Sequence, residues 1–413
     1  MMSVPMKRKC YESSSDNDKK EEMKAKIDTM GPVDLILFSL ESSEPRNFVT
    51  SQRILTTNMN VKIGRTVSEI SLVFGNGSVF NWKFWPDMTM LEDVPKEFID
   101  VEEAGPMRKM DFFKVKIDET TELEHCILGP EAHTIHTIFA PVATTIRKLT
   151  NHLLTLFPNT KLGNASLDLD MLPYSDQSIR ILPFCHCKQL HVKWGHREVL
   201  DAWNDVFTWM RAESGLCLEM ADASSFDLND VPVNYEVLVL NHCQWLKQET
   251  FLKFTCRRMI LNPRGALSYE NFNEYLKKWF EGSVDLEMLE VRDCEMDWMR
   301  KMDLEMGMKR RPRNLRNRGK YFRHDDKLFD FSTAHDYIRD DGVEASLICR
   351  REGFIFVIWK NPEHSIEPPH GMYHSTLHVD DNGWLYPVYH KACTYRDDVV
   401  RIEYQRIMDN IIS

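Results

Sequence analysis

The stretch Leu286-Glu-Met-Leu-Glu-Val-Arg-Asp-Cys294 has the most regular pattern in this chain of 413 residues. Its spacing, L-x-x-L-x-L-x-x-C, is typical of the strand and corner of a leucine-rich repeat. Tyr235-Glu-Val-Leu-Val-Leu-Asn-His-Cys243 has the same layout, and three weaker copies surround Leu190, Leu216 and Met259. These five short apolar segments are predicted to be the strands around which the chain folds.

The fourth position of each copy provides an anchor residue for the repeat. The anchors are Leu190, Leu216, Leu238, Met259 and Leu289, which lie 26, 22, 21 and 30 residues apart. A single strand–helix unit cannot bury its own apolar face, so neighbouring units must stack. The expected fold class is therefore α/β, an irregular leucine-rich-repeat-like strand–helix solenoid. Its linking helices are expected at 196–210, within 244–254, and from a cap at Ser268 to a stop at Gly282.

The segments around this array divide the chain further. We expect a disordered, polar tail over 1–26, a linking β-hairpin region over 61–130 and the repeat-like domain over 131–306. The segment 134–157 at its start is expected to hold an amphipathic helix that Pro141 begins and Pro158 ends. The hairpins pair 70–74 with 79–85 and 344–349 with 354–359. A basic loop is expected at 307–320, a C-terminal cap at 321–360 and a C-terminal extension at 361–413. That extension should contain a turn at Asp381-Asn-Gly383 and a last helix over about 399–411.

Composition excludes several broad classes of protein. The net charge of −11 argues against a general nucleic-acid or anionic-membrane binder, because both attract cationic surfaces. The basic run at 309–320 lacks interleaved aromatic residues, so a solvated loop is favoured over a site for RNA, an acidic protein or an import receptor. The longest apolar run, Phe354–Trp359, is far too short to cross a bilayer. Ten scattered cysteines fit a reducing compartment, so we expect a cytoplasmic or nuclear protein.

The sequence predicts no catalytic site, metal site or cofactor. It lacks the phosphate-binding loops, the dinucleotide-binding loop, the zinc-protease motif and the nucleophile elbow. Cys185-His-Cys187, with His191 and His196, offers zinc ligands, but the spacing is not that of a finger or ribbon, and small core residues are the favoured interpretation. Because His242 and Cys243 are adjacent on a strand, their side chains are expected on opposite faces, which argues against a catalytic pair.

The repeat pattern favours a protein-binding function over a catalytic one. Residues between and just after the paired apolar positions of each strand should point outward and form a mixed polar and apolar row. The predicted target-binding residues are His191, Lys193, Glu219, Asn241, Asn262, Glu290 and Arg292.

Three segments, in this order, resemble the F-box-associated type 2 family, a large nematode group of F-box proteins. Met30–Leu40 with Asn58–Ile63 resembles the second half of an F-box and its exit. Asn271–Gly282 with the strand up to Cys294 resembles the core of the associated domain. Ile338-Arg-Asp-Asp-Gly342 through Trp359 resembles its closing segment. The resemblance covers roughly 30–360 and implies partial F-box-like helices over 27–60, a short N-terminal F-box remnant.

This resemblance implies a substrate-recognition subunit of a cullin-type (SCF) ubiquitin ligase, in which a Skp-type adaptor binds the F-box and the repeat domain binds an unknown protein target. The implied adaptor-docking residues are Pro32, Leu35, Ile36, Ser39 and Leu40. Where a full F-box has an apolar Leu-Pro helix, residues 13–26 are almost entirely polar. The alternative is therefore a protein-binding module that has lost adaptor docking and has no ligase role.

Overall fold

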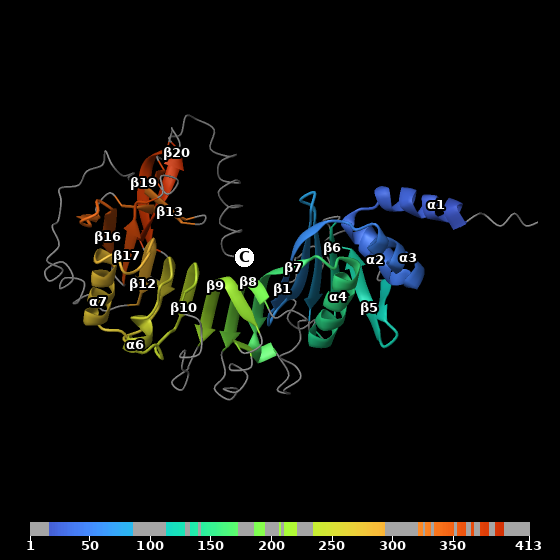
Figure 1. Cartoon of the computed structure of the whole chain (residues 1–413), viewed down its shortest axis with the longest axis horizontal. Helices are drawn as coiled ribbons and strands as arrows, with labels where there is room; N and C mark the ends of the chain where they lie inside the picture. Colours follow the sequence, from blue (N-terminus) through green and yellow to red (C-terminus); the bar gives the residue numbers. More distant parts are fainter. Residues whose placement is uncertain are drawn as a thin grey trace, which may run out of the picture. The chain divides into compact units, whose positions relative to one another are not determined.

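The computed structural model describes the fold of most of the chain (Figure 1). The described residues are 16–85, 113–128, 133–138, 142–171, 186–194, 206–207, 210–220, 234–293, 321–324, 327–331, 334–350, 353–360, 365–366, 372–379 and 385–391. They form two compact units, Met1–Glu213 and Ser214–Ser413, and the boundary falls within strand β9 (Arg211–Met220). This boundary lies inside the segment 131–306 that was predicted to be one repeat domain.

Unit 1 is a mixed sheet with helices on one face. Its strands follow the order β8-β7-β1-β2-β3-β6-β5-β4, in which β1–β7, β7–β8 and β3–β6 are parallel, whereas β1–β2, β2–β3, β4–β5 and β5–β6 are antiparallel. The helices are α1 (Asp16–Asp28), α2 (Pro32–Glu41), α3 (Ser43–Ser51) and α4 (Val142–Leu156). The strands are β1 (Thr56–Ile63), β2 (Ser68–Phe74), β3 (Val79–Trp85), β4 (Phe113–Asp118), β5 (Thr121–Leu128), β6 (Thr134–Ile138), β7 (Lys161–Asp168) and β8 (His186–Trp194), and a short 3-10 turn spans Leu169–Met171.

The core of unit 1 lies between the sheet and helices α2, α3 and α4. Alternation along β2 buries Ile70, Leu72 and Phe74, which belong to the face that packs against α4. Phe74 meets Phe157, just after α4, edge to face at a centroid distance of 5.7 Å. Pro32 begins α2 as expected, because the first helical turn does not need its missing N–H.

Three predictions for unit 1 need correction. The segment 16–26 is helical in α1, although 1–26 was expected to be a disordered tail. Lys, Glu, Met and Ala favour helix without any apolar face, so a lack of core-forming residues did not exclude one. Helix α4 has the predicted limits at Pro141 and Pro158, but residues 134–138, which were included in the same helical segment, form β6. Strand β1 begins at Thr56, inside the segment expected to be helical.

The strands of unit 2 follow the order β9-β10-β11-β12-β17-β16-β15, in which β9 to β12 are parallel and β12, β17, β16 and β15 pair antiparallel. Its strands are β9 (Arg211–Met220), β10 (Val237–Asn241), β11 (Arg258–Leu261), β12 (Met288–Arg292), β15 (His335–Ile338), β16 (Glu344–Arg350) and β17 (Gly353–Ile358). The two helices in its described part are α6 (Gln248–Phe251) and α7 (Tyr269–Phe280). A small sheet joins β13 (Tyr321–His324), β14 (Lys327–Asp330) and β18 (Ser365–Ile366), and β19 (Met372–Val379) pairs with β20 (Leu385–Lys391).

The anchor residues of unit 2 lie side by side on parallel strands. Leu216 is opposite Leu238, Leu238 is opposite Met259, and Met259 is opposite Leu289. All four are nearly completely buried, and α7 packs over this face, where the Tyr275 hydroxyl donates to the Phe254 carbonyl at 3.0 Å. The fifth anchor, Leu190, belongs to unit 1, where it is opposite Ala165 of β7.

Other predictions for unit 2 are confirmed in outline. Helix α7 begins after Ser268, whose N–H donates to the Asn271 side chain at 2.8 Å, and it ends before Gly282, which has a φ of 75°. Hairpin β16–β17 forms as predicted, but β17 also pairs antiparallel with β12, so the expected cap continues the sheet. Strands β19 and β20 pair with Val379 opposite Leu385. The turn predicted at 381–383 is outside the described residues, as are the basic loop 307–320, the helix at 399–411 and most of the helix at 196–210.

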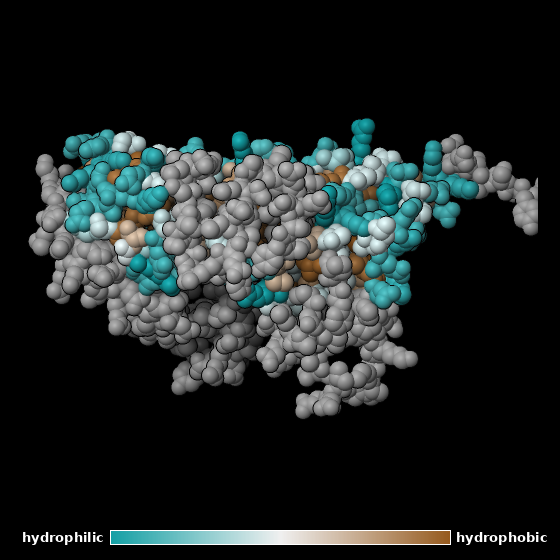
Figure 2. All heavy atoms as spheres, turned by 90° about the horizontal axis from the view of Figure 1, so that it is seen from below, coloured by the Kyte–Doolittle hydropathy of each residue, from teal (hydrophilic) through white to brown (hydrophobic). Residues whose placement is uncertain are grey.

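Within the described ranges, no helix has the length and apolar character needed to cross a bilayer. Figure 2 shows that described residues visible on one face are mostly hydrophilic, with small hydrophobic areas between them. Leu55 and Leu128 are the exposed large hydrophobic side chains of the described part of the chain.

Candidate binding face of the parallel strands

The parallel strands of unit 2 have one face turned away from helix α7. Along β10 and β11, Leu238, Leu240, Met259 and Leu261 are buried, whereas the alternate side chains are half-buried. Val239 is opposite Ile260, and each is followed two residues later by an asparagine, Asn241 and Asn262, on the same face. An apolar row therefore lies directly beside a row of side-chain amides, and we call these four residues the amide face.

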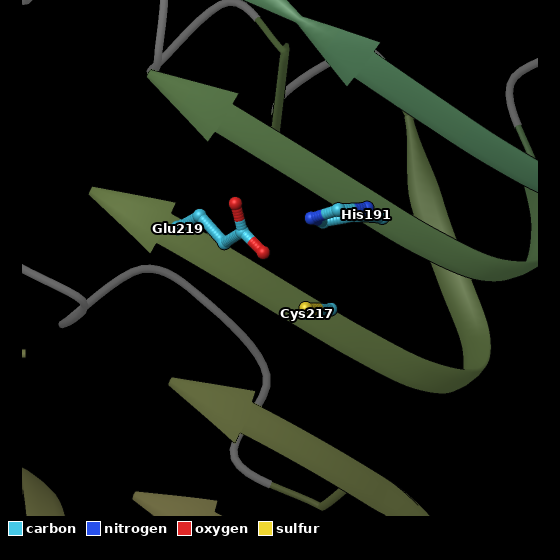
Figure 3. Close-up of side chains that lie close together, drawn as sticks. All are labelled: His191, Cys217 and Glu219. Carbon is cyan, nitrogen blue, oxygen red and sulfur yellow. The ribbon is translucent and has the colours of Figure 1, made fainter. Parts of the chain in front are cut away.

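The same side of the strands continues onto β9, next to the amide face. Figure 3 shows Cys217 and Glu219 on β9, and the register places them opposite Val239 and Asn241. The Asn241 side-chain amide donates to the Glu219 carboxylate at 3.5 Å, a long hydrogen bond. Glu219 and Asn241, which were both predicted to bind a target, are half-buried on this face.

Glu290 does not fit the predicted row. It is only 4% exposed, and its carboxylate accepts a hydrogen bond from Arg292 Nε at 2.9 Å. Glu290 is buried because the β13–β14 sheet covers this side of β12 and β17, with Phe322, Phe329 and Phe331 packed against it. Glu290 is therefore an internal partner of half-buried Arg292 instead of an exposed contact.

The remaining two predicted target-binding residues belong to unit 1. Lys193 is exposed on β8, and His191 is half-buried, with its Nδ1 at 3.2 Å from the Ser166 hydroxyl of β7. The register also places Lys193 opposite Asp168, whose carboxyl pKa is raised, mainly by burial. These residues lie on a different unit from Glu219, Asn241 and Asn262.

The implied adaptor-docking residues of α2 are mostly buried in this structure. Ile36 and Ser39 are fully buried, and Leu35 and Leu40 are 5% and 8% exposed, because α2 packs on β3, β4 and α3. The Ser39 hydroxyl donates to the Ile36 carbonyl at 2.6 Å and lies 3.0 Å from His152 Nε2 of α4. Pro32 is half-buried. In this structure the apolar face of α2 belongs to the core of unit 1.

The buried thiols have the properties of core residues. Burial raises the pKa of Cys243 and of Cys187 to about 12, and that of Cys256 to about 11. A thiol acts as a nucleophile or metal ligand only as the thiolate, which these environments strongly disfavour. Cys185 and Cys294 lie outside the described residues.

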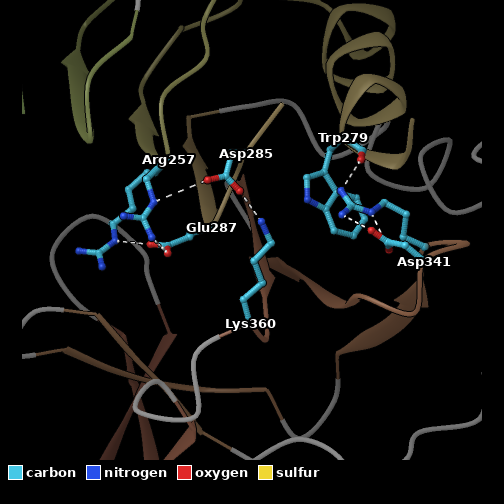
Figure 4. Close-up of polar contacts among 8 residues, drawn as sticks. Arg257, Trp279, Asp285, Glu287, Asp341 and Lys360 are labelled. Atoms are coloured by element: carbon cyan, nitrogen blue, oxygen red, sulfur yellow. Dashed lines mark hydrogen bonds and ion pairs between the residues drawn. The ribbon is translucent and has the colours of Figure 1, made fainter. Parts of the chain in front are cut away.

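Charged groups at the opposite ends of these strands form a structural network (Figure 4). Arg257 and Arg258 at the start of β11 both bind Glu287, which is 6% exposed, and Arg258 Nε donates to it at 3.0 Å. Asp285 pairs with Lys360 and lies 4.0 Å from Arg257. This network joins the start of β11, the approach to β12 and the end of β17.

The segments that carried the resemblance also contact one another in unit 2. Arg339 lies over the Trp279 ring at 5.2 Å, donates to the Trp279 carbonyl at 3.1 Å and donates through Nε to Asp341 at 2.9 Å. Gly342, with a φ of 88°, completes the turn. The turn of the closing segment thus binds the last turn of helix α7.

Comparison with known protein families gives a match that includes the strands of the amide face. The family model described as F-box associated matches residues 227–291, from before β10 to the end of β12. The chain is similar to F-box-associated domains over these residues, and we call 227–291 the F-box-associated region. No curated protein and no solved structure matches the chain. The F-box-associated region contains Val239, Asn241, Ile260 and Asn262, so the amide face lies entirely within it.

Sequence reasoning missed a set of residues at the ends of the strands. His242, Arg264 and Asp293 have positive φ values of 57°, 44° and 54°, and they follow β10, β11 and β12. His242 and Asp293 occupy the same position of the repeat, immediately before its cysteine. The repeat spacing therefore indicated that these two positions would share a backbone conformation. For residues with side chains this backbone conformation is uncommon and costs energy.

Proposed function

We propose that the chain is a non-enzymatic protein-binding module that holds a protein target on the amide face of its F-box-associated region. The observation that carries this proposal is the coincidence of the family match with a half-buried apolar and amide row in register on parallel strands. Such a mixture of apolar contact area and hydrogen-bonding groups is typical of protein-binding surfaces. No catalytic role is assigned to any residue.

The test compares proteins that co-purify with the tagged full chain and with a Val239→Asp/Ile260→Asp variant. Both side chains are half-buried, so the aspartates place charge at the centre of the surface while the anchors beneath are kept. Partners that the variant loses, and that then bind the purified wild-type chain directly, are the expected result. An unchanged set of partners from a folded variant contradicts the proposal, and Glu274→Lys on the exposed side of α7 is the matched control.

A second candidate, a substrate receptor of a cullin-type ligase, is favoured by the F-box-associated match alone. Adaptor docking through α2 would require Leu35, Ile36 and Leu40 to leave the core of unit 1, where they are buried. We therefore expect the full chain and a purified Skp-type adaptor to elute separately in size-exclusion chromatography. Co-elution of the two proteins would instead support the receptor function.

A further inference from the structure

The end of β10 departs from a regular ladder. Asn262 donates its N–H to the Leu240 carbonyl at 2.9 Å, and its own carbonyl accepts from Cys243 N at 2.8 Å. In a regular parallel ladder the second bond would come from His242, two residues after Leu240. The left-handed conformation of His242 inserts one extra residue at this point, a bulge of the kind that redirects side chains near functional sites.

Two polar atoms at this bulge are buried without a hydrogen-bond partner among the described residues. They are His242 Nδ1 and Asn262 Oδ1, which belong to neighbouring strand ends. A buried polar atom without a partner destabilises a fold by about 1–3 kcal/mol. The two unpartnered atoms and the strained backbone of His242 therefore make this site less stable than a regular strand end would be. Local strain of this kind is often found at binding sites.

The charged groups around these atoms are partly open to solvent. Arg264 Nε lies 3.3 Å from Asp293, and the two side chains are 45% and 44% exposed. The pKa of His242 is lowered, mainly by burial and then by Arg264, against the opposing effect of Glu219 and Asp293. The imidazole is therefore neutral near pH 7 and offers one donor and one acceptor, as the Asn262 carboxamide also does.

Donor and acceptor pairs of this kind match the peptide group. We propose that His242 and Asn262 bind the main chain of an extended segment of the target, whose side chains contact Val239 and Ile260. This inference rests on the proposed function and specifies which atoms of the target are recognised. It also agrees with the position of ligand sites in open α/β sheets, at the carboxyl ends of parallel strands.

The test uses random peptides displayed on phage and selected on the immobilised full chain. A selected peptide, labelled with a fluorophore, is then titrated with wild type, Asn262→Leu and His242→Asn; asparagine tolerates the positive φ at 242. We expect each substitution to weaken binding roughly tenfold, or about 1.4 kcal/mol. Asn234→Leu, at an exposed position before β10, is the control and should bind normally.

Thermal unfolding and N-methylation separate binding from folding. Because Asn262→Leu removes an unsatisfied polar atom, the variant should unfold at the same temperature as wild type or higher. Should it unfold earlier, Asn262→Asp, which keeps the shape and loses the N–H donors, takes its place. Methylation of one backbone nitrogen of the peptide should reproduce the loss of affinity.

Peptides that bind wild type, Asn262→Leu and His242→Asn equally well would overturn the inference and leave the proposed function intact. A selection that enriches no peptide would also overturn it. The proposed function fails separately, when the Val239→Asp/Ile260→Asp variant keeps every partner.

Discussion

Individual residues in unit 2 show how a buried charge is stabilised by the chain around it. The single carboxylate of Glu287, just before β12, has two guanidinium partners: Arg257, just before β11, and Arg258, its first residue. Removing one member of a buried ion pair usually costs more than the pair contributes, because the other charges remain. The two arginines are partly exposed, which reduces the cost.

We expect Glu287→Ala to lower the free energy of unfolding by about 2 kcal/mol. Asp285→Ala is the matched control, because the Asp285 side chain is 68% exposed and should contribute less than about 1 kcal/mol. Urea denaturation of both variants measures the difference. Equal losses would show that burial of Glu287 does not determine the effect.

A second residue-scale effect concerns pH. The pKa of His152 is lowered from 6.5 to about 4, first by burial and then by the charge of Arg46, and Ser39 Oγ accepts from its Nε2–H. Because the unfolded state binds a proton at higher pH than the folded state does, this group contributes stability above about pH 6.5, and the contribution is lost as pH falls toward 4.

His152→Gln should therefore flatten the decline in melting temperature between pH 7 and pH 4.5, while retaining an N–H donor for Ser39. Scanning calorimetry at several pH values measures the slope. The pKa of His136 is also lowered to about 4, so protonation of His136 should still cause part of the decline in melting temperature in this variant. A slope identical to that of wild type would contradict the assignment to His152.

At the scale of elements, strands β1 and β7 approach each other through a glycine. A Cβ at Gly163 would lie 2.6 Å from Asn60 Oδ1 and 2.9 Å from Asn58 Nδ2. The same Asn60 oxygen accepts from the N–H of Asn164, where the β1–β7 register shifts. The glycine therefore permits a bulge whose backbone is held by a side chain.

We expect Gly163→Ala to destabilise unit 1 by about 1–3 kcal/mol, because the added methyl overpacks this junction. Adding Asn60→Ala should recover part of the loss by opening space. Gly31→Ala is the control, since its nearest atom would be at an ordinary 3.7 Å. Thermal melts of the three variants and the double variant test this, and additive losses in the double variant would contradict it.

At the scale of the whole molecule, segments far apart in the chain complete each unit. In unit 2, Trp279 at the end of α7 contacts Phe356 of β17 and Arg339, which lies between β15 and β16. The hairpin β16–β17 and the turn before it therefore pack against the helix that covers the parallel strands. An arginine suits this place because its planar group stacks on the ring while donating several hydrogen bonds.

Arg339→Lys should consequently lower the free energy of unfolding by about 1 kcal/mol or more, although charge is conserved. Arg264→Lys, a more exposed arginine in the same unit, should have a smaller effect. Chemical denaturation followed by tryptophan fluorescence compares them. Equal effects would mean that stacking on Trp279 contributes nothing.

Local pattern alone predicted the parallel anchors, helix α7 with its cap and stop, and the hairpins β2–β3 and β16–β17. In each of these, neighbours in sequence carry the signal, through alternation, spacing or turn residues. Strand β6 and helix α1 were missed because short segments with no long-range context are equally compatible with other structures.

The sequence by itself determined which side chains alternate along each strand, and hence that Val239, Asn241, Ile260 and Asn262 share a face. Only the tertiary structure decided which faces stay open. The β13–β14 sheet buries Glu290, and the core of unit 1 takes up the face of α2 that contains Ile36 and Ser39. Burial depends on contacts between residues distant in the chain, and a single sequence does not contain that information in its local pattern.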